Sequence, residues 1–182
     1  MYDKISIGID QSYTRTGISV AVDGKLKLVT SIEFKNCKCN TDKREKIKKA
    51  LMGLIEKLQK RTNKLIIICE RIRLFSQGFI NQSYLSSTGA LIATIVDTAH
   101  IYGVDVFSVD TRSWKSQVIG SSKSEACDKK LETIKFVKTL GFDVGHRNKN
   151  GMIQFDDDAS DSACIALYAF IPETNQKLKL EK

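Results

Sequence analysis

The feature that most constrains this chain is a pair of apolar segments that each end on an acidic residue. Residues 4–10 alternate isoleucine with small or polar residues, which is typical of a strand, and the pattern stops at Asp10. Residues 65–69 form a continuous apolar run that ends at Glu70, which predicts a strand buried on both faces. Such a strand requires helices on both sides of its sheet, so we expect an α/β fold.

The other periodicities predict one mixed sheet. Strands are expected over 17–22 and 25–34, joined by an Asp23-Gly24 hairpin turn, and a basic amphipathic helix follows with Asp42 in its N-terminal cap. The later elements are expected as a helix over 82–102, a strand over 104–109, a helix over 122–140 and a helix over 156–171. This order is that of a ribonuclease-H-like mixed five-stranded sheet with helices on both faces.

Length and hydropathy favour one compact domain. The 182 residues are expected to form a single domain over 1–175 and a charged, frayed tail over 176–182, with no segment of membrane-spanning length. The N-terminus lacks the features of a secretory signal, and the five cysteines suggest no disulfide framework. We therefore expect an intracellular protein.

The net charge of +8 is concentrated in two segments. Residues 35–64 contain eleven basic and three acidic residues, and residues 112–138 contain seven basic and three acidic residues. Either segment alone would be interpreted as a solvated helix face, but together they hold more than the whole surplus. We therefore expect a nucleic-acid backbone as partner.

Four acids are candidates for a metal centre. Asp10 and Glu70 end strands that this fold places side by side, and Asp158 and Asp161 are three residues apart on one helix face. Converging carboxylates repel one another unless cations are present, and ligands that are all oxygen favour Mg²⁺, with Mn²⁺ as a substitute, over zinc. Two such ions about 4 Å apart can activate a water molecule and stabilise the leaving oxygen of a phosphodiester, and Asp10 would bridge them.

Structural roles compete with this hypothesis at several positions. The alternatives are a polar turn for Asp10, an ion pair with Arg71 or Arg73 for Glu70, and helix capping for Asp156, Asp157 and Asp158. Asp161 resists such an explanation, because the helix around it becomes apolar on every side. Asp157 would replace Asp158 as a ligand if the helix register differed by one residue.

These residues stand in blocks that resemble the RuvC family of Holliday-junction resolvases. The blocks are Ile-Gly-Ile-Asp10 with Thr16-Gly17, the strand-end Glu70, Trp114-Lys115 to Gly120, and Asp158-Ala-Ser-Asp161 to Ala166, in family order. The resemblance implies a homodimer with two active sites, each nicking one strand of a four-way junction with magnesium. It implies that the catalytic residues and metal ligands are Asp10, Glu70, Asp158 and Asp161.

The resemblance also implies contacts with DNA. Lys115 is expected at DNA or the scissile phosphate, and the candidates for further contacts are Lys123, Lys129, Lys130, Arg73 and Phe75. Asp10 is followed by Gln-Ser-Tyr where bacterial members have Pro-Gly. With the lysine- and isoleucine-rich composition, this difference favours a phage or viral branch that acts on junctions, forks or flaps in the host cytoplasm, in recombination, repair or genome processing.

Two other classes of function remain open. A non-catalytic branched-DNA-binding protein would keep the basic segments without needing the four acids. An actin-like-fold phosphotransferase also begins with a strand, an aspartate and a Thr-Gly pair, but it needs two such lobes and this length supplies one. The favoured prediction is a metal-dependent endonuclease that hydrolyses phosphodiester bonds in branched DNA.

Overall fold

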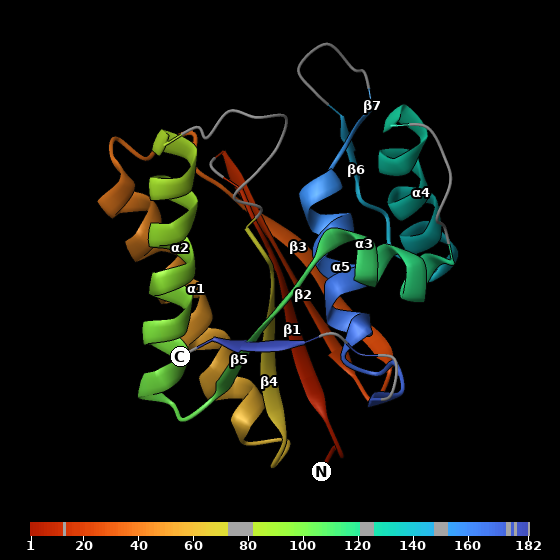
Figure 1. Ribbon diagram of the computed structural model, residues 1–182, viewed down its shortest axis with the longest axis horizontal. Helices are drawn as coiled ribbons and strands as arrows, with labels where there is room; N and C mark the ends of the chain where they lie inside the picture. The colour runs from red at the N-terminus through yellow and green to blue at the C-terminus, as the bar shows by residue number, and fades with distance from the viewer. Residues whose placement is uncertain are drawn as a thin grey trace.

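The computed structural model of the chain describes residues 1–12, 14–72, 82–120, 126–147, 153–173, 176 and 178–181. Its centre is a six-stranded mixed sheet in the order β3-β2-β1-β4-β5-β8 (Figure 1). The strands of this sheet are β1 (Ile5–Gln11), β2 (Arg15–Val22), β3 (Lys25–Glu33), β4 (Leu65–Glu70), β5 (Asp105–Val109) and β8 (Lys179–Glu181). The helices are α1 (Asn40–Gln59), α2 (Gln82–Ile101), α3 (Thr111–Trp114), the π-helix η1 (Lys115–Ile119), α4 (Ala126–Thr139) and α5 (Asp157–Tyr168).

The chain opens as the predicted antiparallel meander and continues with parallel strands. β1 pairs antiparallel with β2 and parallel with β4, and β4 pairs parallel with β5. The turn between β2 and β3 has positive φ at both Asp23 (47°) and Gly24 (78°), as a two-residue hairpin turn requires. The predicted α/β class is confirmed.

The predicted count of five strands is wrong. β8 pairs antiparallel with β5, with Phe107 opposite Leu180, and forms the sixth strand at the edge of the sheet. Ser108 Oγ donates a hydrogen bond to Glu181 Oε1 at 2.6 Å, which fixes this pairing. A short charged segment carries no local strand signal, and its pairing follows from the unpaired edge that β5 would otherwise expose.

Two local expectations are also corrected. Helix α1 begins at Asn40, so Asp42 lies in its first turn rather than at its N-cap and accepts a hydrogen bond from Lys38 N at 2.8 Å. The segment between the helices expected over 122–140 and 156–171, where no strand was expected, contains two short strands, β6 (Gly145–Arg147) and β7 (Ile153–Phe155), which form a separate antiparallel pair.

Helices cover both faces of the sheet, as predicted (Figure 1). On one face, alternate residues of β1 pack against buried positions of α1 and α2; the cluster includes Ile5, Ile7, Ile9, Ile47, Leu51 and Ile95. On the other face α5 lies against β1 and β2, with α3 and α4 beside it (Figure 1). None of the helices in the described ranges is long and apolar enough to cross a membrane.

Helix α5 packs very closely on the sheet at two glycines, Gly8 of β1 and Gly17 of β2. A Cβ atom on Gly8 would collide with the backbone of Ser162 and Ala166, and one on Gly17 would collide with the carbonyl of Asp158. Ser6 Oγ donates to the carbonyl of Ala166 at 2.6 Å across this contact. The backbone of α5 therefore approaches the strands more closely than ordinary side chains permit.

Replacing Gly8 with alanine tests this contact. Because the added methyl group meets helix backbone that cannot move alone, Gly8→Ala is expected to lower the free energy of unfolding by about 1–3 kcal/mol or more in urea denaturation. Gly53→Ala is the control, since nothing lies within 4 Å of a Cβ there and alanine favours the helix by up to about 1 kcal/mol. Equal stability of the two variants would contradict the packing argument.

Candidate metal centre

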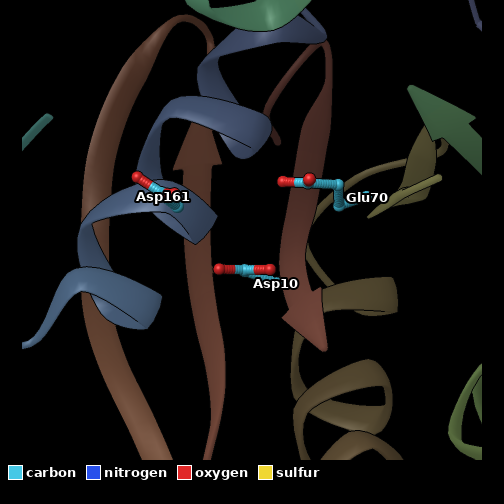
Figure 2. A group of neighbouring side chains, drawn as sticks. All are labelled: Asp10, Glu70 and Asp161. Atoms are coloured by element: carbon cyan, nitrogen blue, oxygen red, sulfur yellow. The ribbon is translucent and has the colours of Figure 1, made fainter. Parts of the chain in front are cut away.

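Three carboxylates from three elements meet at one end of the sheet (Figure 2). One oxygen from each of Asp10, Glu70 and Asp161 lies within 4.8 Å of the others. Ile9 of β1 stands opposite Cys69 of β4 in a parallel pair, so the residues that follow them, Asp10 and Glu70, emerge side by side. Helix α5 adds Asp161 from the face that packs on β1. The predicted convergence of these three acids is confirmed.

One of the acids at the N-terminus of α5 has a structural role as the helix cap. Asp156 is the N-cap, and its Oδ1 accepts from the backbone N of Ala159 at 3.0 Å. Arg15 Nη1 lies 3.3 Å from Asp156 Oδ2 and holds this acid against β2. The alternative of helix capping therefore holds for Asp156, and the acids that follow it are not needed as the cap.

Asp158 lies outside the group of three carboxylates that meet within 4.8 Å. Its backbone carbonyl faces Gly17, and its side chain is partly buried one turn before Asp161. Its charge nevertheless raises the pKa of Asp10, after burial and the charges of Glu70 and Asp161. The assignment of Asp158 as a fourth ligand therefore stays a prediction.

Burial and the charges of neighbouring acids disfavour the ionised forms of Asp10, Asp158 and Asp161. Burial raises the pKa of Asp10 well above its usual range, and the charge of Glu70 raises it further. Burial raises the pKa of Asp161 to about 6, against the opposing effect of Lys115, and burial raises the pKa of Asp158 to about 7 with help from Asp157. Such a cluster holds protons near neutral pH unless a cation replaces them.

Lys115 is a cation at the edge of the cluster. Its Nζ lies 3.8 Å from Asp161 Oδ2, and both side chains are mostly buried, at 19% and 18% exposed. The same Nζ lies 4.9 Å from the centre of the Trp114 ring. Lys115 therefore offsets part of the negative charge of the cluster from one side.

The donor set fits a hard divalent cation. The three converging side chains offer only carboxylate oxygens, which suit Mg²⁺ or Mn²⁺. Asp161 Oδ1 is buried and has no hydrogen-bond partner within the described part of the chain. A buried carboxylate oxygen without a donor is costly, and a cation held with Asp10 and Glu70 would supply the missing interaction.

Glu70 has partners that the sequence did not indicate. Thr111 Oγ1 donates to Glu70 Oε1, and Trp114 Nε1 donates to Glu70 Oε2 at 3.4 Å. The alternative of an ion pair between Glu70 and Arg71 is not borne out in the described region, where Arg71 donates to Ser108 Oγ at 3.3 Å. Trp114 is fully buried, and its indole N–H is directed at Glu70 of the acidic cluster.

Several predicted DNA-contact residues cannot be placed relative to the cluster. Arg73, Phe75 and Lys123 lie outside the described residues. Lys129 and Lys130 belong to helix α4, but their side chains lie outside the described part of the structure. Their proposed contacts with DNA stay predictions, whereas Lys115 stands beside the acids.

The comparisons with solved structures decide the fold family. Thermus thermophilus RuvC bound to a Holliday-junction substrate has a TM-score of 0.66 at 18% identity, over 92% of this chain and 93% of that chain. A second structure of Thermus thermophilus RuvC has a TM-score of 0.65 at 16% identity, over 91% of this chain and 93% of that one. This chain has the RuvC fold.

A third, less similar structure agrees with this result. The yeast mitochondrial Holliday-junction resolvase Ydc2 has a TM-score of 0.52 at 15% identity, over 92% of this chain and 78% of that chain. No protein-family model matches the chain, and no curated protein matches its sequence. The resemblance to the RuvC family is thus confirmed at the level of the fold.

The acidic cluster should make stability depend on pH when divalent ions are absent. A carboxyl whose pKa is raised by folding stabilises the native state fully below its unfolded pKa, and this contribution is lost as pH rises through the folded pKa. For Asp161 the folded pKa is about 6, so the loss between pH 4 and pH 7 is on the order of 3 kcal/mol. Urea denaturation in EDTA should therefore show stability falling across this range.

Asp161→Asn should flatten that profile and leave the protein as stable as the wild type, or more stable, at pH 8 in EDTA. Asp105→Asn is the matched control, because Asp105 is exposed at the opposite end of β5. Added Mg²⁺ should raise the stability of the wild type most at high pH, where the carboxylates are ionised. A profile for Asp161→Asn identical to that of the wild type would contradict the electrostatic account.

Proposed function

We propose that this protein is a metal-dependent endonuclease that nicks Holliday junctions or other branched DNA by hydrolysing phosphodiester bonds. The observation that carries the proposal is the convergence of Asp10, Glu70 and Asp161 at the end of parallel strands in a RuvC fold. One RuvC structure with this fold is in complex with a Holliday-junction substrate, which supports branched DNA as the substrate class. A protein that only binds DNA would have no need of a buried, mutually repelling acidic cluster.

We propose Mg²⁺ as the natural ion, with Mn²⁺ as a substitute and two ions in each active site. When bound, the ions would supply an activated water and stabilise the leaving oxygen of the cleaved bond. The role of the protein would be to hold these ions in place, with Asp10 between β4 and α5 and with Asp158 as the proposed fourth ligand. The raised pKa of Asp161, about 6, implies that ion binding competes with protons below neutral pH.

The basic residues in and next to α1 divide into those that contact neighbouring elements and those that stay exposed. In the first part of α1, Lys43 Nζ lies 5.8 Å from the Phe34 ring, Arg44 donates to Thr94 Oγ1 at 2.8 Å, and Lys46 donates to the carbonyl of Glu33 at 2.7 Å. These contacts tie the helix to its neighbours. The exposed lysines that remain for DNA phosphates are Lys49 and Lys57 of α1 and Lys60, which follows the helix.

Further parts of the proposal concern the assembly and its setting. We propose a homodimer, because resolving a four-way junction requires two nicks placed symmetrically, and each chain supplies one acidic cluster. Forks and flaps are proposed as additional substrates. A phage or viral role in recombination, repair or genome processing, in the host cytoplasm, rests on the lysine-rich composition and the Gln-Ser-Tyr that follows Asp10.

Cleavage of labelled DNA is the direct test. In Mg²⁺, the wild type should nick a four-way junction and a fork but not a linear duplex. Asp10→Asn and Asp161→Asn should bind the junction and lose roughly a thousandfold in nicking rate, because each variant removes several kcal/mol of ion-dependent stabilisation. A wild type that binds junctions but never cuts in Mg²⁺ or Mn²⁺ would replace the proposal with a non-catalytic binding function.

Lys115 provides a separate test of substrate contact. Lys115→Met keeps the aliphatic stem and removes the charge, so nicking of the junction should fall roughly tenfold to a hundredfold through one lost charged contact with phosphate. Lys25→Met is the control, since Lys25 is exposed at the hairpin end of β3, away from the acids. Equal nicking rates for the two variants would show that Lys115 only balances charge near Asp161.

A further inference from the structure

We infer that Thr111 and Trp114 are positioning residues that hold the Glu70 carboxylate in one orientation beside Asp10 and Asp161 before a cation binds. The inference deepens the proposed function and rests on it in one respect, that the acidic cluster is an ion site. Neither residue belongs to the cluster itself. Their role is to hold one of its acids in a single orientation.

The contacts with Glu70 are complementary. Thr111 Oγ1 donates to Oε1, and Trp114 Nε1 donates to Oε2 at 3.4 Å, so each oxygen has its own donor. Two donors on two oxygens fix the rotation of the carboxylate as well as its direction. A free glutamate side chain loses conformational entropy when an ion orders it, and these contacts remove part of that cost from ion binding.

The backbone places the two donors where Glu70 needs them. Glu70 stands opposite Val109 in the parallel pair of β4 and β5, so the chain leaves β5 beside this acid. Asp110 then caps α3, with its side chain accepting from Ser113 N at 3.0 Å. Thr111 and Trp114 are three residues apart in the helical turn and share one face.

The same segment also reaches a second acid. Trp114 is fully buried, and the next residue, Lys115, places its Nζ 3.8 Å from Asp161 Oδ2. The helix changes to a π-helix at Lys115, a feature often found at functional sites. On the other side of Glu70, Gln11 Nε2 donates to its backbone carbonyl, so β1 and α3 hold both ends of this residue.

Trp114 makes the inference measurable, because it is the single tryptophan of the chain. Its indole N–H gives one resonance in a ¹⁵N-labelled protein, and that proton lies between the ring and Glu70 Oε2. Mg²⁺ binding at Glu70 should shift this resonance in proportion to occupancy. The titration yields an ion affinity without DNA and without measuring cleavage.

The test compares four proteins in Mg²⁺ titrations followed by the indole resonance. Thr111→Val, which keeps the side-chain shape and removes the donor, should weaken Mg²⁺ binding on the order of tenfold. Thr111→Ser, which keeps the hydroxyl, should restore binding to near the wild-type affinity. Thr98→Val is the matched control, since the Thr98 hydroxyl also donates a hydrogen bond, to the carbonyl of Thr94 within α2, and has no contact with Glu70 in the described residues.

A second variant guards against an indirect effect. Trp114→Phe keeps an aromatic ring and removes the N–H, and calorimetry with Mn²⁺ should show a similar loss of affinity with a thermal unfolding midpoint near that of the wild type. Unchanged ion affinity in both Thr111→Val and Trp114→Phe would overturn the positioning role alone. A wild type that binds no divalent ion would instead overturn the proposed function, and this inference with it.

Discussion

The acidic cluster depends on the close contact between helix α5 and strands β1 and β2. Gly8 and Gly17 leave room for helix backbone where any other residue would place a side chain. Because the helix lies directly on the sheet, Asp161 reaches the strand end that carries Asp10. If a layer of side chains separated this helix from the sheet, Asp161 would lie too far from Asp10 and Glu70 to join them.

This proximity has an electrostatic cost that the fold does not remove. Burial and the neighbouring negative charges raise the pKa of Asp10, and they raise the pKa of Asp161 to about 6, while Lys115 balances only part of the charge of the cluster. Clustering the acids therefore makes the ion-free protein less stable than it would be if the acids lay far apart. A bound divalent cation relieves this repulsion. The free energy by which the acids destabilise the folded protein is therefore recovered when an ion binds.

The orientation of Glu70 depends on a different part of the chain. The turn that follows β5 supplies Thr111 and Trp114 to the carboxylate, while Gln11 of β1 holds its backbone carbonyl. These contacts join three elements that are distant in sequence and meet only in the folded sheet. A rigid set of acids binds an ion with less loss of freedom than a mobile one.

Local patterns in the sequence were sufficient for the main strands and helices and for the positions of Asp10 and Glu70, because alternation, apolar runs and strand ends are properties of neighbouring residues. The place of Asp161 followed from an acid within an apolar helix, a conflict that is visible locally. The pairing of β8 and the donors to Glu70 were decided by the tertiary structure alone. Both depend on which residues the sheet brings together across long stretches of chain, and a free strand edge or a buried carboxylate selects its partner only after the chain has folded around it.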